Sequence, residues 1–212
     1  MVVAARCAPR LAELVARRAL PFLFVAPALA QSGGDYRWRV IRNGSAIGTQ
    51  SVTFTQHGAE RVAVAEMLVV PSVMGVVVYR FEHRYTEVTR GGNFVSVRSR
   101  LNRNGRITEV EADATPHGVA LRGPEGALQL PANAAPLSWW EPQRFGGATP
   151  VFGTTTGRLM DLRWAREALP GGGVRWRTTG ELEAVLEFAA AGRWSAYQVK
   201  GDDGINVIYE AA

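Results

Sequence analysis

The chain has 212 residues, of which 47% are hydrophobic and 20% are charged, and its formal net charge is +5. These proportions are ordinary for a globular protein and exclude a long disordered or low-complexity chain. Four arginines and one glutamate lie in the first 30 residues, and the remaining 20 basic and 18 acidic residues nearly balance. We expect no nucleic-acid partner, and the formal charge of +5 overstates the case for binding either nucleic acid or an acidic membrane.

The first 30 residues have the pattern of a secretory signal peptide. Arginines precede an apolar run over residues 19–28, and an A-x-A cleavage site ends at Ala30. The run is too short to anchor the chain permanently in a bilayer. We expect cleavage after Ala30 and a single mature domain over residues 31–212, with no integral membrane segment.

The only cysteine, Cys7, lies within this predicted signal peptide, so the mature domain has no cysteine for a disulfide. An exported, cysteine-free and β-rich domain favours a location in the periplasm of a Gram-negative bacterium.

The first predicted strands form a hairpin that contains a bulge. Residues 36–42 alternate apolar and basic side chains and end at Asn43-Gly44, the dipeptide of a tight turn. In the returning strand, the apolar positions begin at Ile47 and continue at Val52, so the apolar set changes from odd to even positions. This change requires a bulge, and Gly48 is the natural place for it. A third strand is predicted over residues 61–70.

The stretch from Val76 to Val88 predicts one long, half-buried strand, because its side chains alternate with a period of two. One face carries Val77, Tyr79, Phe81, His83 and Tyr85, and the other carries Arg80, Glu82, Arg84 and Thr86.

A second strand over residues 94–102 completes a hairpin with this one. We place a three-residue loop at residues 90–92. A two-residue loop of Gly91 and Gly92 would pair charged residues of one strand with apolar residues of the other. Loops of three residues favour glycine at the left-handed position. The resulting register pairs Phe81 with Leu101, Tyr85 with Val97, and His83 with Ser99.

The next predicted turn contains Asn104-Gly105 and sets Arg98 beside Glu111 and Arg100 beside Glu109. Opposite charges therefore meet across the strands, which supports the register. We interpret this run of arginine and glutamate as a solvated outer face rather than as a basic ligand-binding patch.

Short strands around residues 119–122 and 127–130 precede a segment, 130–153, in which the alternation stops. This segment holds four prolines, together with Trp139 and Trp140. Ser138 and Glu141 have the spacing of a capping box, so we predict one short helix inside a long ordered loop. Loops of this length tend to be lids or plugs, and we expect at least one tryptophan to cap the sheet's open end.

Further strands are predicted over residues 158–165, 174–179, 182–188, 194–200 and 205–210, and residues 166–169 suggest additional helix. About ten strands with tight turns and no βαβ spacing predict an all-β fold. We expect an antiparallel meander curled into a barrel or a half-barrel.

No motif in the sequence identifies an enzyme, and we predict no metal and no cofactor, since no zinc, phosphate-loop or serine-hydrolase motif occurs. The best catalytic candidate is His83 with Ser99, but no acid reaches the histidine and the serine is mid-strand. A buried histidine hydrogen-bonded to a serine explains the same residues. Burial without an acidic partner should lower the pKa of His83.

The candidate ligand-binding residues lie on the predicted interior face of the central hairpin and in the long loop. They are Tyr79, Phe81, His83, Tyr85, Ser99, Trp139 and Trp140. Small barrels are filled by side chains, whereas slightly larger ones hold a ligand at the mouth. These residues therefore either line a hydrophobic cavity or fill a core.

The pattern Tyr79-x-Phe81-x-His83-Arg84-x-Thr86-Glu87, followed by Gly91-Gly92, resembles an uncharacterised family of secreted bacterial proteins, a domain-of-unknown-function group. Ser138-x-Trp140 and the glycines Gly180 and Gly192 resemble that family too. Its members tend to carry asparagine after the tryptophan, where this chain has Glu141. The resemblance implies an exported antiparallel β fold and supplies no substrate.

Three functional hypotheses follow from the sequence. The first is a periplasmic β-barrel-like protein that binds a hydrophobic or lipid-like ligand, as a carrier or an envelope-maintenance factor. The second is a periplasmic interaction or structural protein with a solid core, and the third is a hydrolase that uses His83 and Ser99. A cavity of several hundred cubic ångströms would favour the first hypothesis, and a filled interior the second.

Overall fold

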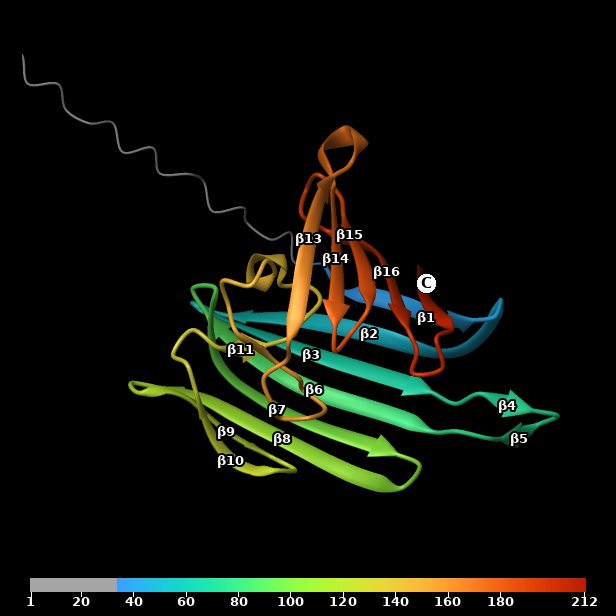
Figure 1. Ribbon diagram of the computed structural model, residues 1–212, viewed down its shortest axis with the longest axis horizontal. Coiled ribbons are helices and arrows are strands. Elements are labelled where there is room, and N and C mark those ends of the chain that lie inside the picture. The colour runs from blue at the N-terminus through green and yellow to red at the C-terminus, as the bar shows by residue number, and fades with distance from the viewer. Residues whose placement is uncertain (1–33) are drawn as a thin grey trace, which may run out of the picture. The chain divides into compact units, whose positions relative to one another are not determined.

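The computed structural model describes residues 34–212; the predicted signal peptide, residues 1–30, lies outside the described residues. Apart from two 3₁₀ turns, the regular elements of the described chain are strands (Figure 1). They are β1 (Tyr36–Arg42), β2 (Ser45–His57), β3 (Glu60–Val69), β4 (Ser72–Val73), β5 (Val76–Val77), β6 (Phe81–Arg90), β7 (Asn93–Arg103), β8 (Arg106–Thr115), β9 (Gly118–Gly123), β10 (Gly126–Leu130), β11 (Ala135–Pro136), β12 (Val151–Phe152), β13 (Leu162–Ala168), β14 (Val174–Gly180), β15 (Ala184–Phe188), β16 (Trp194–Lys200) and β17 (Asn206–Ala211).

One 13-stranded antiparallel sheet has the order β10-β9-β8-β7-β6-β3-β2-β1-β17-β16-β15-β14-β13. The sheet curls, so that β13 to β16 run across the direction of β2 and β3 in Figure 1. Its terminal strands, β10 and β13, are not paired with each other, and the sheet therefore remains open. The predicted all-β, antiparallel, curled meander is confirmed, and of the two alternatives the half-barrel is the one observed.

The bulge predicted at Gly48 is present in the β1–β2 hairpin. Val40 pairs with Gly48 and Ile41 with Ala46, so Ile47 is the extra residue. Gly48 also lies against the backbone of β3: a Cβ atom at this position would be 2.1 Å from the carbonyl oxygen of Leu68. The position thus requires glycine because the backbone of β3 lies too close for a side chain, and it also lies at the bulge that the change of parity requires.

The predicted strand over residues 76–88 is divided in two. β5 leaves the large sheet and pairs only with β4, so Val76 and Val77 are exposed rather than half-buried. From Phe81 onward the predicted faces are confirmed, since Tyr85 is buried and Arg84 is exposed.

The register predicted between β6 and β7 is wrong by two residues. His83 pairs with Leu101 and Tyr85 with Ser99, and the turn is the two-residue Gly91-Gly92 loop between Arg90 and Asn93. A bulge beside the turn restores the parity that a two-residue loop alone would have broken. Because the error is an even number of residues, every side chain keeps its predicted face.

The register predicted between β7 and β8 is confirmed, with Arg98 opposite Glu111 and Arg100 opposite Glu109. The side chain of Arg98 nevertheless reaches diagonally to Asp113, at 2.8 and 2.9 Å from its two carboxylate oxygens. These groups lie on the exposed outer face, as the alternation predicted.

Residues 131–161, here called the plug segment, connect the two ends of the sheet and cover part of its concave face. The predicted short helix is a single 3₁₀ turn, Pro142–Arg144, whereas the helix suggested at 166–169 is wrong: residues 166–168 belong to β13. Trp140 is buried and stacks on Tyr85, with ring centroids 5.6 Å apart, and Phe145 stacks on Trp164 at 4.4 Å. The plug segment thus packs against both halves of the sheet.

We predict that Gly48→Ala destabilises the protein by more than about 2 kcal/mol, because the new methyl group collides with backbone that cannot move independently. Gly44→Ala is the matched control: its site is open and only its positive φ is unfavourable, so about 1 kcal/mol is expected. Urea denaturation measures both values. Equal losses for the two variants would contradict the close approach at Gly48.

Candidate ligand cavity

A cavity of about 860 Å³ occupies the part of the concave face that the plug segment leaves open. One wall comes from β3 and β6 and the opposite wall from β16 and β17, with the plug segment closing one side. The apolar and aromatic lining includes Met67, Val69, Tyr79, Phe81, Tyr85, Leu137, Trp139, Leu182, Tyr197, Val199, Val207 and Tyr209.

Five of the seven predicted ligand-binding residues line this cavity. They are Tyr79, Phe81, His83, Tyr85 and Trp139. The other two, Ser99 and Trp140, are buried and absent from its wall: Ser99 bonds to His83, and Trp140 stacks on Tyr85. Trp140 therefore belongs to the packed interior, whereas Trp139 is available to a ligand.

His83 and Ser99 are hydrogen-bonded, although they are diagonal neighbours rather than the directly opposed pair that was predicted. His83 Nε2 lies 2.9 Å from Ser99 Oγ, and Ser99 Oγ donates to the Thr154 carbonyl oxygen at 2.7 Å. Because the serine has one proton and a carbonyl only accepts, His83 Nε2 must be the donor to Ser99. A histidine that donates cannot deprotonate the serine, so this geometry does not activate a nucleophile.

Four buried ionisable groups in the inner wall of the cavity, His83, Tyr85, Tyr197 and Tyr209, are held in their uncharged forms. Burial lowers the pKa of His83 to about 4, as the sequence predicted. Burial also raises the pKa of Tyr85, Tyr197 and Tyr209, which keeps these phenols protonated. At neutral pH this part of the wall therefore carries no charge.

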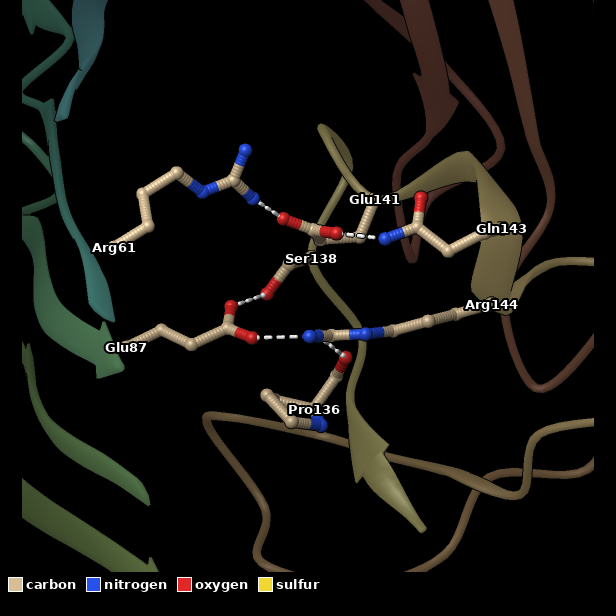
Figure 2. A network of polar contacts seen from close by, with 7 residues as sticks. All are labelled: Arg61, Glu87, Pro136, Ser138, Glu141, Gln143 and Arg144. Atoms are coloured by element: carbon tan, nitrogen blue, oxygen red, sulfur yellow. Dashed lines mark hydrogen bonds and ion pairs between the residues drawn. The ribbon is translucent and has the colours of Figure 1, made fainter. Parts of the chain in front are cut away.

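A buried ion pair ties the plug segment to the sheet beyond the cavity (Figure 2). Arg144 Nη2 lies 2.5 Å from Glu87 Oε1, and Arg144 Nη1 donates to the Pro136 carbonyl oxygen at 3.0 Å. Ser138 Oγ donates to the other Glu87 oxygen at 2.5 Å. The predicted capping box is therefore wrong, because the Ser138 hydroxyl binds a carboxylate on β6 instead of a backbone N–H.

A second ion pair lies beside the first. Glu141 on the plug segment pairs with Arg61 of β3 and accepts a hydrogen bond from Gln143 (Figure 2). Arg61 also lies over the ring of Phe54, 5.1 Å from its centroid. Burial is the main cause that lowers the pKa of Arg61. We call Arg61, Glu87, Ser138, Glu141 and Arg144 the Glu87 network.

The Glu87 network and the cavity use opposite ends of the same two strands. β3 contributes Arg61 to the network and Met67 to the cavity, while β6 contributes Glu87 and Phe81 respectively. Because charged groups this deeply buried are costly unless paired, the network fixes where the plug segment lies. The position of the plug segment in turn sets the size of the remaining cavity.

The sequence did not predict the Glu87 network or the cavity wall formed by β16 and β17. Glu87 has the interior parity of β6, and a carboxylate on an apolar face was the available signal. Its partner Arg144 is 57 residues away, and nothing local to either residue indicates the pairing. Tyr197 and Val199, like Val207 and Tyr209, alternate on one face, but their strand order was not predictable from that pattern.

The family model described as "Domain of unknown function (DUF6134)" matches residues 38–212. Among solved structures, the chain is similar to a beta-barrel-like protein of the DUF1849 domain family from Brucella abortus. The TM-score is 0.58 at 7% identity, over 84% of this chain and 94% of that one. At this identity the likeness shows the fold alone. No curated protein matches the sequence.

We predict that Arg144→Met costs about 3–5 kcal/mol of stability, because it leaves the Glu87 carboxylate buried without its cation. Adding Glu87→Leu to this variant should recover part of the loss, since the uncompensated charge is then removed. Arg39→Met is the control: its pair with Glu210 is exposed, and a change below about 1 kcal/mol is expected. Equal losses in chemical denaturation for Arg39→Met and Arg144→Met would contradict the role assigned to the network.

We predict that an NMR titration gives His83 a pKa near 4. Because this lies below the unfolded value of about 6.5, the folded state binds fewer protons between the two. Lowering the pH through this interval should therefore reduce the free energy of unfolding. His83→Gln should remove this part of the pH dependence and keep the fold. A pKa above the unfolded value would instead require a carboxylate partner for the ring.

Proposed function

This chain belongs to the DUF6134 family, a domain of unknown function, and from the geometry of its cavity we propose that it binds a hydrophobic or lipid-like ligand. The observation that carries the proposal is the cavity of about 860 Å³ with a mainly apolar and aromatic lining. Its volume is within the range of small-molecule sites, roughly 300–1,000 Å³.

The distribution of charge favours a ligand with a long apolar part. The inner wall holds a neutral His83 and protonated tyrosines, whereas Arg42, Arg103, Lys200, Asp202 and Asp203 line the cavity at strand ends and in the turn after β16. An apolar chain would gain about 25 cal/mol for each square ångström that it removes from water. A polar head group would find partners among the charged residues near the mouth.

We place this activity in the periplasm, as that of a carrier or an envelope-maintenance factor. The support is the signal-peptide pattern of residues 1–30 and the absence of cysteine after them. No helix in residues 34–212 is long and apolar enough to cross a membrane.

The alternative is an interaction protein with a solid core. A filled interior is present only in the part of the concave face that the plug segment covers. There Trp140 and Phe145 are buried and stack on rings of the sheet. The hydrolase hypothesis is disfavoured because the Ser99 proton is donated to Thr154.

Native mass spectrometry of protein purified from the periplasm of a Gram-negative host, followed by lipid extraction, tests the proposal. A co-purifying amphiphile would identify the ligand class. For a defined assay, the delipidated protein is titrated with a fluorescent fatty acid, for which Trp139 is a nearby energy donor in the cavity wall.

We predict that Val207→Trp weakens fatty-acid binding at least about tenfold, equivalent to about 1.4 kcal/mol, because the indole occupies the cavity. Ile208→Trp is the control, since the next residue of β17 is exposed on the opposite face. Circular dichroism checks that both variants fold. Equal affinity of the two variants, or no binding by the wild-type protein, would overturn the proposal.

A further inference from the structure

The β4–β5 hairpin and its flanks, residues 71–78, expose apolar side chains to an unusual extent. The exposed fractions are 100% for Met74, 65% for Val76, 54% for Val77 and 57% for Val78. Exposed large apolar residues elsewhere in the described chain reach at most 43%. Exposure of this kind, concentrated in one short segment, marks an interaction site.

The hairpin is a closed structure rather than a loose loop. Ser72 pairs with Val77 and Val73 with Val76, and the Val78 amide donates to the Pro71 carbonyl oxygen at 3.1 Å. β4 and β5 pair only with each other and extend past the ends of β3 and β6 (Figure 1). The three residue steps from Pro71 to Met74, which begins the turn, reach about 10 Å.

The exposure of neighbouring residues indicates the kind of partner. Val76 and Val77 are consecutive strand residues, so their side chains point to opposite faces of the hairpin, and both are exposed. A protein surface or a second copy of the chain would cover one face and leave the other in water. A lipid bilayer surrounds an inserted hairpin on both faces.

Basic residues lie at the base of the hairpin. Asn104 joins the turn between β7 and β8 to Arg80, two residues after the hairpin region. Its backbone N–H donates to the Arg80 carbonyl oxygen at 2.9 Å, and its side-chain Oδ1 accepts from the Arg80 N–H at 2.7 Å. This brings Arg80, Arg103 and Arg106 to one end of the sheet, where Glu82 pairs with Arg80. The local excess of positive charge would attract anionic head groups.

The same end of the molecule contains the cavity mouth. Pro71 and Val78 of the hairpin region line the cavity, and so does the next residue, Tyr79. On the other side of the mouth, Arg42 pairs with Asp203, so those charges largely offset each other. Residues that line the cavity are therefore adjacent in the chain to the exposed apolar residues of the hairpin.

We propose that the β4–β5 hairpin docks the protein on an anionic lipid bilayer, with Met74, Val76 and Val77 in the interfacial region and the three arginines at the head groups. Interfacial segments enter about 5–10 Å, which is within reach of this hairpin. Docking brings the cavity mouth against the lipid, but it does not depend on the cavity being occupied.

The test is flotation of the protein with vesicles of phosphatidylethanolamine and phosphatidylglycerol. The protein is produced from the full chain in a Gram-negative host, and its N-terminus is identified by intact mass. We expect the double variant Val76→Ser/Val77→Ser to bind at least about tenfold more weakly than the wild type. The matched control is Leu68→Ser/Leu128→Ser, which removes two exposed apolar side chains outside the hairpin and should bind as the wild type does.

Two further variants separate the contributions of the arginines and of the cavity to vesicle binding. Arg103→Gln/Arg106→Gln should reduce binding to anionic vesicles while leaving the weaker binding to phosphatidylcholine vesicles unchanged. Val207→Trp, which fills the cavity, should leave flotation unchanged, so a failure of ligand binding and a failure of docking are distinguishable. Hairpin-dependent dimers in light scattering without lipid would show that the partner is a second copy. That result, or equal flotation of the wild type and the hairpin variant, would overturn the proposal.

Discussion

The buried ion pair between Glu87 and Arg144 is the constraint on which the interior of this protein depends. A carboxylate in the middle of an apolar sheet face is tolerable only if a cation and hydrogen-bond donors reach it. Arg144 and Ser138 meet this requirement, and both lie on the plug segment. The pair therefore specifies one position for a long connection that contains little regular structure of its own. Hydrophobic contacts such as that of Trp140 with Tyr85 add stability, but they are less selective about geometry.

With the plug segment fixed at one end of β3 and β6, the concave face has two parts with different properties. One is densely packed with aromatic rings, and the other is an open cavity whose buried histidine and tyrosines are neutral. A half-barrel filled along its whole length would have no room for a ligand, and one without a plug would expose too much apolar surface to water. The structure lies between these two extremes, and the hairpin of β4 and β5 stands at the open side.

Much of the sheet was predictable because period-two alternation and turn dipeptides are local signals. The Gly48 bulge and the pairing of Arg98 with Glu111 follow from such signals alone. The register of β6 with β7 was not predictable, since a bulge beside the Gly91-Gly92 turn changes the pairing without changing the faces. Four of the five candidates that line the cavity, Tyr79, Phe81, His83 and Tyr85, were predicted from their parity, and Trp139 from its place in the long loop. The partnership of Glu87 with Arg144 and the second wall of the cavity depend on tertiary contacts between distant segments, which no local pattern encodes.

The place of β1 in the sheet has a consequence for how the chain folds. Strands β1 to β3 and β6 to β10 pair with strands near them in sequence, and so do β13 to β17. The two series join through one ladder, in which Trp38 pairs with Ala211 and Arg42 with Val207. Closing so large a loop carries an entropic cost that nearest-neighbour hairpins avoid, and contacts of this range slow folding. Each series can therefore assemble early by local pairing, whereas the cavity, which needs walls from both, forms only after the last strand has found the first.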